Sequence, residues 1–208
     1  FGQEVLTDNN LRGRLNSKMS IKAYFDQTGE LDYDRLSILA GININDGELR
    51  EFVMLENFAA ALKAKDLARV RFSNLENYLE ISRNTIYFPA MFIQSSAMNL
   101  TVSGSHTFSQ VMDYNLKVNA GQVLANKIAK HDNNLELLPA RRRGFFNLYY
   151  TITGNLENFT YKRNKRKVKA KFAQSEERKR RIQRNLEREF AEAIPPIEEP
   201  GDWGDQGI

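Results

Sequence analysis

Four segments of this chain alternate apolar and polar side chains with a period of two. They lie at residues 20–25, 98–103, 114–119 and 146–152. This alternation is typical of β-strands in a sheet that packs one face on a core and turns the other to water. We therefore predict a mainly β fold with some α structure, in which a curved antiparallel sheet forms an elongated groove.

The same alternation predicts which side chains share a face of the sheet. A slip of one residue would turn a whole apolar set to water, so the strand register is strongly specified. We expect turns at Asp46-Gly47, Ser103-Gly104 and Gly154-Asn155, where Gly adopts angles that other residues resist. Nine side chains are predicted to form one apolar, lipid-facing groove surface: Met98, Leu100, Val102, Tyr114, Leu116, Val118, Leu148, Tyr150 and Ile152.

Two other segments have the period of a helix. From 48 to 64, apolar residues recur every three or four positions without Gly or Pro, which predicts an amphipathic helix packed on the sheet. Near the end of the chain, Ser175 is the expected N-cap of a basic helix, which Pro195-Pro196 ends. Its narrow apolar stripe has a spacing of four and consists of Ile182, Leu186 and Phe190.

The charge is distributed unevenly. Residues 1–161 hold 17 basic and 17 acidic residues, whereas residues 162–184 hold 12 basic residues against two Glu. We therefore predict a β-groove domain at 1–161, a basic helical extension at 162–194 and an acidic, disordered tail at 195–208. The basic residues expected to contact an anionic surface are Lys162, Arg163, Lys165, Arg166 and Lys167.

Length and composition exclude several classes of protein. A chain of 208 residues buries enough surface to fold without staples. The absence of Cys excludes disulfide frameworks and thiol catalysis. The longest apolar stretches, such as 88–93, are far shorter than the ~20 residues of a membrane-spanning helix. Because the chain opens on Phe1 without a secretion signal, we expect a fragment or a processed form.

The sequence predicts no enzyme. It contains no Gly-rich phosphate loop, paired-His zinc motif or acidic calcium loop, so no catalytic residue, metal or cofactor is expected. Ser103, Ser105 and His106 are interpreted as turn residues, because neighbouring side chains point apart and the nucleophile-elbow pattern is missing. His131-Asp132 lies in a polar stretch and is interpreted as a loop.

The order of the segments resembles the C-terminal region of the AsmA-like proteins of Gram-negative envelopes, in the version seen in Bacteroidetes-type bacteria. The resemblance covers roughly residues 11 to 165. It is carried by Gly41–Leu49, a helix through Phe58 and Leu62, strand regions Leu67–Phe72 and Tyr78–Ile81, and the runs Ile86–Ser95, Leu100–Phe108, Asp113–Val118 and Leu148–Asn158.

The resemblance implies a non-enzymatic protein on the periplasmic side of the envelope. Such a protein is held in the inner membrane by an N-terminal helix, binds phospholipid or other acyl-chain lipids in its groove, and takes part in outer-membrane biogenesis and intermembrane lipid transport. Two alternatives stay open. One is a structural β scaffold or interaction module in the periplasm, and the other is a nucleic-acid-binding protein that uses the basic segment.

Overall fold

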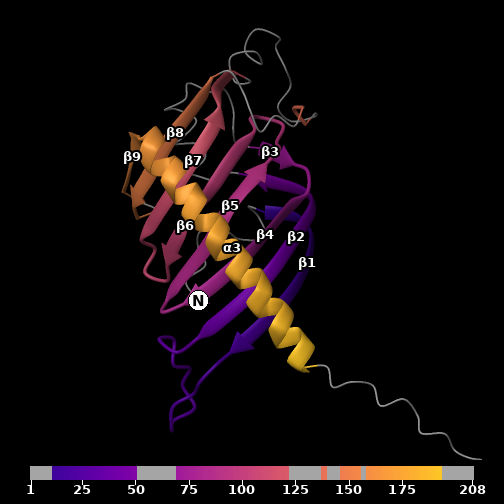
Figure 1. Ribbon diagram of the computed structural model, residues 1–208, viewed down its shortest axis with the longest axis vertical. Helices are drawn as coiled ribbons and strands as arrows, with labels where there is room; N and C mark the ends of the chain where they lie inside the picture. The colour runs from indigo at the N-terminus through magenta and orange to yellow at the C-terminus, as the bar shows by residue number, and fades with distance from the viewer. Residues whose placement is uncertain (1–10, 51–68, 122–136, 140–145, 156–157, 194–208) are drawn as a thin grey trace, which may run out of the picture.

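The computed structural model describes residues 11–50, 69–121, 137–139, 146–155 and 158–193. These residues form one curved, open, antiparallel sheet of nine strands, with one C-terminal helix packed on it (Figure 1). The mainly β prediction is therefore confirmed. The strands are β1 (Leu11–Lys22), β2 (Ser37–Arg50), β3 (Arg69–Phe72), β4 (Leu75–Ser82), β5 (Thr85–Ile93), β6 (Leu100–Thr107), β7 (Met112–Asn119), β8 (Asn147–Gly154) and β9 (Phe159–Arg163).

Neighbouring strands in the sheet are also neighbours in the sequence. The order is β1-β2-β4-β5-β6-β7-β8-β9, and β3 pairs with the far end of β2. β3 and β4 share one register on β2, because Phe72 lies opposite Gly47 and Leu75 lies opposite Ile44. They are two parts of one interrupted strand. The sheet is thus a simple meander whose two edges are β1 and β9.

Two of the predicted turns are wrong, because the glycines lie inside strands. Asp46-Gly47 falls within β2, where Asp46 has a φ of 53° and the strand is irregular. Gly104 lies within β6 opposite Tyr114, and a Cβ there would come 2.4 Å from the carbonyl oxygen of Asp113. Glycine allows a close approach between strands at Gly104. The turn at Gly154-Asn155 is confirmed, since β8 ends there and Gly154 has a φ of 129°.

The predicted start of the helix at residue 48 is wrong. Residues 48–50 are the last residues of β2 and pair with β3, so the apolar residue Leu49 lies opposite Val70 in a sheet. A short apolar run fits either period, and here pairing with a neighbouring strand decides the outcome. The rest of the predicted helix, 51–64, lies outside the described residues, as does His131-Asp132.

The predicted apolar face is confirmed as one face of the sheet. Cross-strand pairs place Leu100, Val118 and Leu148 in one row. The next rows continue along the same face, because directly opposed residues in an antiparallel sheet point the same way. All nine predicted side chains pack in one hydrophobic cluster, together with Val70, Ala97 and Met112.

The C-terminal helix α3 (Lys165–Ala193) begins eleven residues earlier than predicted. Asn164 is its N-cap, because the Asn164 Oδ1 accepts a hydrogen bond of 2.9 Å from the Lys167 N–H. Ser175, the predicted cap, lies inside the helix. Its Oγ donates to the Phe172 carbonyl at 2.8 Å and accepts from the Ala90 N–H of β5 at 3.0 Å.

Helix α3 crosses the sheet diagonally on the face opposite the hydrophobic cluster (Figure 1). That covered face is polar, and the row Ser103, Asn115 and Thr151 is buried in it. Apolar contact is therefore limited to a few points, of which Val168, Ile182 and Leu186 are buried. The predicted stripe packs on the sheet at Ile182 and Leu186, so α3 is a layer of the fold, not a free extension.

Charged and aromatic groups supply the remaining contacts of α3. Glu80 of β4 accepts hydrogen bonds from Arg178 at 2.8 Å and from Arg181 at 2.9 Å. The Arg178 guanidinium lies 4.0 Å from the centroid of the Tyr87 ring. Lys18 of β1 lies 4.0 Å from the centroid of Phe190, near the C-terminal end of the helix. Cation–π contacts and one shared carboxylate thus dock α3 onto the polar face.

We predict that Glu80→Gln lowers the free energy of unfolding by about 1–2 kcal/mol, because two arginines lose a charged acceptor that is only partly exposed to water. Glu177→Gln is the matched control, since Glu177 is an exposed carboxylate on α3, the helix that Glu80 docks. Urea unfolding measures both. Equal losses in the two variants would contradict the docking role of Glu80.

Candidate functional site: the aliphatic face

The candidate site is the part of the apolar sheet face that lies on β1, β2, β4 and β5. Residues at alternate positions there point away from α3, because their neighbours Lys18, Tyr78 and Glu80 contact the helix. We call this surface the aliphatic face. It consists of Leu15, Met19, Ile21, Ile38, Ala40, Ile42, Ile44, Leu75, Leu79, Ile81 and Ile86.

Strand register arranges these side chains in rows across the sheet. One row runs Ile21, Ile38, Ile81 and Ile86, and another runs Leu15, Ile44 and Leu75. A third row holds Met19, Ala40 and Leu79. Only the row that contains Ile42 is interrupted by polar residues, Ser17 and Asn77. The rows make one continuous aliphatic surface.

This surface is incompletely covered. Leu15 is 62% exposed, Met19 44% and Ile21 56%, all on the edge strand β1. The isoleucines of β2, β4 and β5 are half-buried. Isolated apolar side chains at a surface need no explanation, but a contiguous exposed apolar patch marks a binding surface for a ligand, a membrane or a protein.

Asn77 joins β4 to β5 where the regular ladder between them is interrupted. The β4–β5 ladder ends at Glu80 and Tyr87, β5 shifts its register against β6 between Phe88 and Met91, and Pro89 has no N–H to donate. The Asn77 Nδ2 donates to the Pro89 carbonyl at 3.0 Å, and the side chain is 1% exposed. A buried amide thus holds the sheet together at the only polar position of the face on β4.

The nine residues predicted to face a lipid differ in how deeply they are buried. Six of them, Met98, Tyr114, Leu116, Val118, Tyr150 and Ile152, are buried and form the core. Leu100, Val102 and Leu148 are partly buried at its margin. The strongly exposed apolar side chains on this face of the sheet lie instead on the edge strand β1, next to the half-buried side chains of β2, β4 and β5. Sequence reasoning missed it, although the alternation of Ile38, Ile42 and Ile44 in β2 was a usable signal.

Ser103, Ser105 and His106 were predicted to lie in a turn. They lie on strand β6 instead, so the predicted turn is wrong. Ser103 and Ser105 point to the covered face and line a cavity of about 200 Å³ beneath α3, with Asp113 and Asn115. His106 alternates with them and points to the opposite face, where its Nδ1 lies 2.8 Å from the Tyr114 hydroxyl. No hydroxyl of this pair of serines reaches the imidazole, which argues against a hydrolase arrangement.

Burial controls the ionisation of the His106–Tyr114 pair. It lowers the pKa of His106 and raises the pKa of Tyr114 to about 12. Both groups are therefore neutral at physiological pH. They form a neutral hydrogen bond in the sheet, and His106 lies opposite Ile86 at the end of the aliphatic face.

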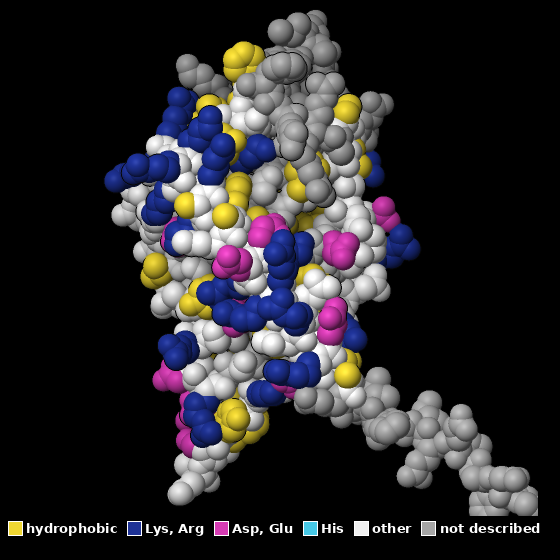
Figure 2. Space-filling view, viewed as in Figure 1, with side chains coloured by type: hydrophobic (Ala, Val, Ile, Leu, Met, Phe, Trp, Pro, Cys, Tyr) yellow, Lys and Arg dark blue, Asp and Glu magenta, His cyan; other side chains and the backbone are white. Residues whose placement is uncertain are grey.

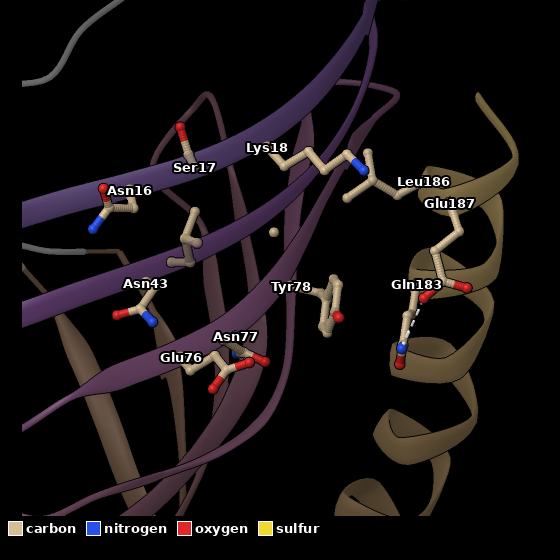
Figure 3. Close-up of a pocket in the computed structure, with 12 residues that line it drawn as sticks. Asn16, Ser17, Lys18, Asn43, Glu76, Asn77, Tyr78, Gln183, Leu186 and Glu187 are labelled. Carbon is tan, nitrogen blue, oxygen red and sulfur yellow. Dashed lines mark hydrogen bonds between the residues drawn. The ribbon is translucent and has the colours of Figure 1, made fainter. Parts of the chain in front are cut away.

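A larger cleft of about 460 Å³ lies between β1, β2 and β4 and the C-terminal half of α3 (Figure 3). Gly41 forms part of its floor, and the Tyr78 ring faces the helix across it. Gln183 and Glu187 of α3 hydrogen-bond to each other at 3.0 Å on the helix side. Amide and charged side chains line the cleft together with Ile42, Tyr78 and Leu186, so it offers more polar groups than the aliphatic face does.

The basic residues predicted to contact an anionic surface are all exposed. Lys162 and Arg163 end β9, and Lys165, Arg166 and Lys167 form the first turn of α3. Figure 2 looks onto α3 and shows Lys and Arg side chains gathered at the upper left, where the helix begins. Within the described part of the chain, no cluster of side chains suits a metal ion and no helix is long and apolar enough to cross a membrane.

Comparison of the chain with protein-family models, with curated proteins and with solved structures gave no match.

We predict that the free energy of unfolding decreases as the pH falls below about 6.5, because the unfolded chain protonates its histidine more readily than buried His106 does. His106→Gln should reduce this pH dependence, whereas His131→Gln, at the chain's other histidine, serves as the control. His106→Ala should cost about 1 kcal/mol at neutral pH, because the Tyr114 hydroxyl loses its partner. Urea unfolding between about pH 7.5 and pH 5.5 measures these effects. An unchanged pH dependence in His106→Gln would contradict the assignment.

Proposed function

We propose that this protein is a non-enzymatic lipid-handling protein whose aliphatic face binds the acyl chains of phospholipids. The single observation that carries the proposal is the aliphatic face on β1, β2, β4 and β5, which is exposed at Leu15, Met19 and Ile21 and mostly half-buried on the other strands. The resemblance of the chain's sequence to the AsmA-like proteins supports a place on the periplasmic side of a Gram-negative envelope, with inner-membrane attachment. It also supports a role in outer-membrane biogenesis and intermembrane lipid transport.

Physical chemistry favours acyl chains over polar ligands at this face. Of the side chains in its rows, only Ser17 and Asn77 are polar, and Asn77 is buried. Burial of apolar area is non-directional, contributes about 25 cal/mol per Å² and needs no matched hydrogen bond. An acyl chain can therefore lie along the rows in more than one position, which suits a protein that handles lipids without chemical change.

A structural scaffold is the second candidate, and the burial of the β6–β8 part supports it. There the apolar side chains form a closed core, with Val118 fully buried and Met112 1% exposed. A closed core of this kind leaves no apolar side chain there for a ligand to cover. A scaffold would use its exposed aliphatic edge to contact protein instead of lipid.

Binding of a phospholipid that carries a fluorescent acyl chain distinguishes the two candidates. The triple variant Leu15→Gln, Met19→Gln and Ile21→Gln removes the three most exposed side chains of the aliphatic face. Because each contributes part of the roughly 1.5–3 kcal/mol of a buried aliphatic side chain, the affinity should fall at least about tenfold.

The matched control removes three exposed apolar side chains from other positions, Val111, Leu137 and Phe146, which are 52%, 40% and 67% exposed. Replacement of these three by Gln should leave the affinity unchanged. An equal loss in both triple variants, or no lipid binding by the unmodified chain, would favour the scaffold.

A further inference from the structure

We propose that the corner formed by the end of β9 and the first turn of α3 docks the protein onto an anionic phospholipid bilayer, edge-on and without insertion. We call this surface the basic corner. It consists of Lys162, Arg163, Lys165, Arg166 and Lys167, all of them exposed. The inference goes beyond acyl-chain binding, since it uses other residues on another part of the molecule.

The charge of the basic corner is concentrated and unopposed in the sequence. From residue 162 to residue 175 the chain has seven Lys and Arg and no acidic residue. The exposed N-terminus of α3 adds the positive end of the helix dipole at the same place. Basic residues close to an anionic leaflet attract it additively, so five neighbouring cations favour a negatively charged surface over a single anionic group.

The basic corner lies at the edge of the sheet and presents cations on both sides of it. Lys162 pairs with Thr151, so its side chain belongs to the covered face. Arg163 pairs with Tyr150 on the opposite face, and its Nε lies 3.3 Å from the Tyr150 hydroxyl. A flat bilayer can touch both groups only if the sheet stands on its β9 edge, which leaves both faces of the sheet free of the membrane.

Packing within the protein opposes insertion of α3. Val168, Ile182 and Leu186 are at most 4% exposed, Phe172 is half-buried, and the Lys18 ammonium lies over the half-buried Phe190 ring. An interfacial helix needs its apolar side chains free to enter the acyl region. Attachment through the basic corner is therefore electrostatic and should depend on salt.

The basic corner suits a bilayer better than a nucleic acid. Proteins that bind single-stranded nucleic acids combine a basic groove with aromatic platforms for the bases. Here the cations stand on a protruding edge, and the adjacent ring of Tyr149 is already approached by the Lys165 ammonium at 5.8 Å from its centroid. The basic corner therefore favours a bilayer as its partner, and the experiment below also measures binding to nucleic acid.

Vesicle cosedimentation of the full chain tests the proposal. It should bind vesicles of phosphatidylcholine mixed with phosphatidylglycerol and should not bind vesicles of phosphatidylcholine alone. Binding should weaken at least about tenfold between 0.1 M and 1 M salt, because the Debye length falls from about 10 Å to about 3 Å. Replacement of all five residues of the basic corner by Gln should weaken it at least about a hundredfold.

A control variant removes the same amount of charge elsewhere, by replacement of Arg12, Arg83, Arg180, Arg184 and Arg188 with Gln. Its affinity for the anionic vesicles should fall less than about tenfold. Each of these arginines is exposed. Salt-insensitive binding, equal binding to neutral vesicles or equal losses in the two variants would overturn the proposal. Tighter binding of duplex or single-stranded DNA per phosphate, in the same buffer, would overturn it in favour of nucleic acid. If the corner variant fails to fold, the lipid and salt dependence of the unmodified chain decide.

Discussion

The pleat of the antiparallel sheet is the constraint on which the rest of this structure depends. Each strand sends alternate side chains to opposite faces, so a single register fixes two chemically different surfaces at once. Between β1 and β5 one surface is aliphatic, and the other carries Lys18, Tyr78 and Glu80 toward α3. The docking of α3 and the position of the candidate site both depend on this difference between the two faces.

Helix α3 covers the polar face and not the apolar one, which is unusual for a layer of helix on sheet. A basic helix has few apolar side chains to bury, and this one uses them at Ile182 and Leu186. Its arginines meet Glu80 and the Tyr87 ring instead. Because the helix covers the polar face, it leaves the aliphatic face on the other side of the sheet uncovered by α3. The charge of the helix is thus matched to the face that it covers.

Much of the fold could be predicted from the sequence because period two is a local signal. Strands β6, β7 and β8 and their shared apolar face follow from alternation alone. Long-range pairing could not be predicted in this way. The strand at Glu48 to Arg50 depends on β3, and Gly104 lies within a strand because Tyr114 approaches it across the ladder. In both places a local pattern was compatible with two structures, and tertiary contacts selected one.

The nine residues predicted to form the groove lie on one face of the sheet, and the proposed aliphatic face is on other strands of that same face. Alternation shows that Val118 and Ile152 share a face, but it does not show how deeply that face is covered. Burial depends on which segments pack over each part of the sheet. The same limit applies to α3. Its apolar spacing predicted a helix, whereas the contacts of Glu80 and Ser175 that bind it to the sheet join residues 85 to 101 positions apart.

Photolabelling with a phospholipid that carries a diazirine in its acyl chain tests most directly whether the two faces have different roles. The account predicts that residue-level mass spectrometry finds the label on Leu15, Met19 and Ile21, and on neighbouring side chains of the aliphatic face. Lys18 and Ser20, which alternate with them on β1 and point to the covered face, should be unlabelled. Label distributed equally over both sets, or confined to α3, would contradict the account.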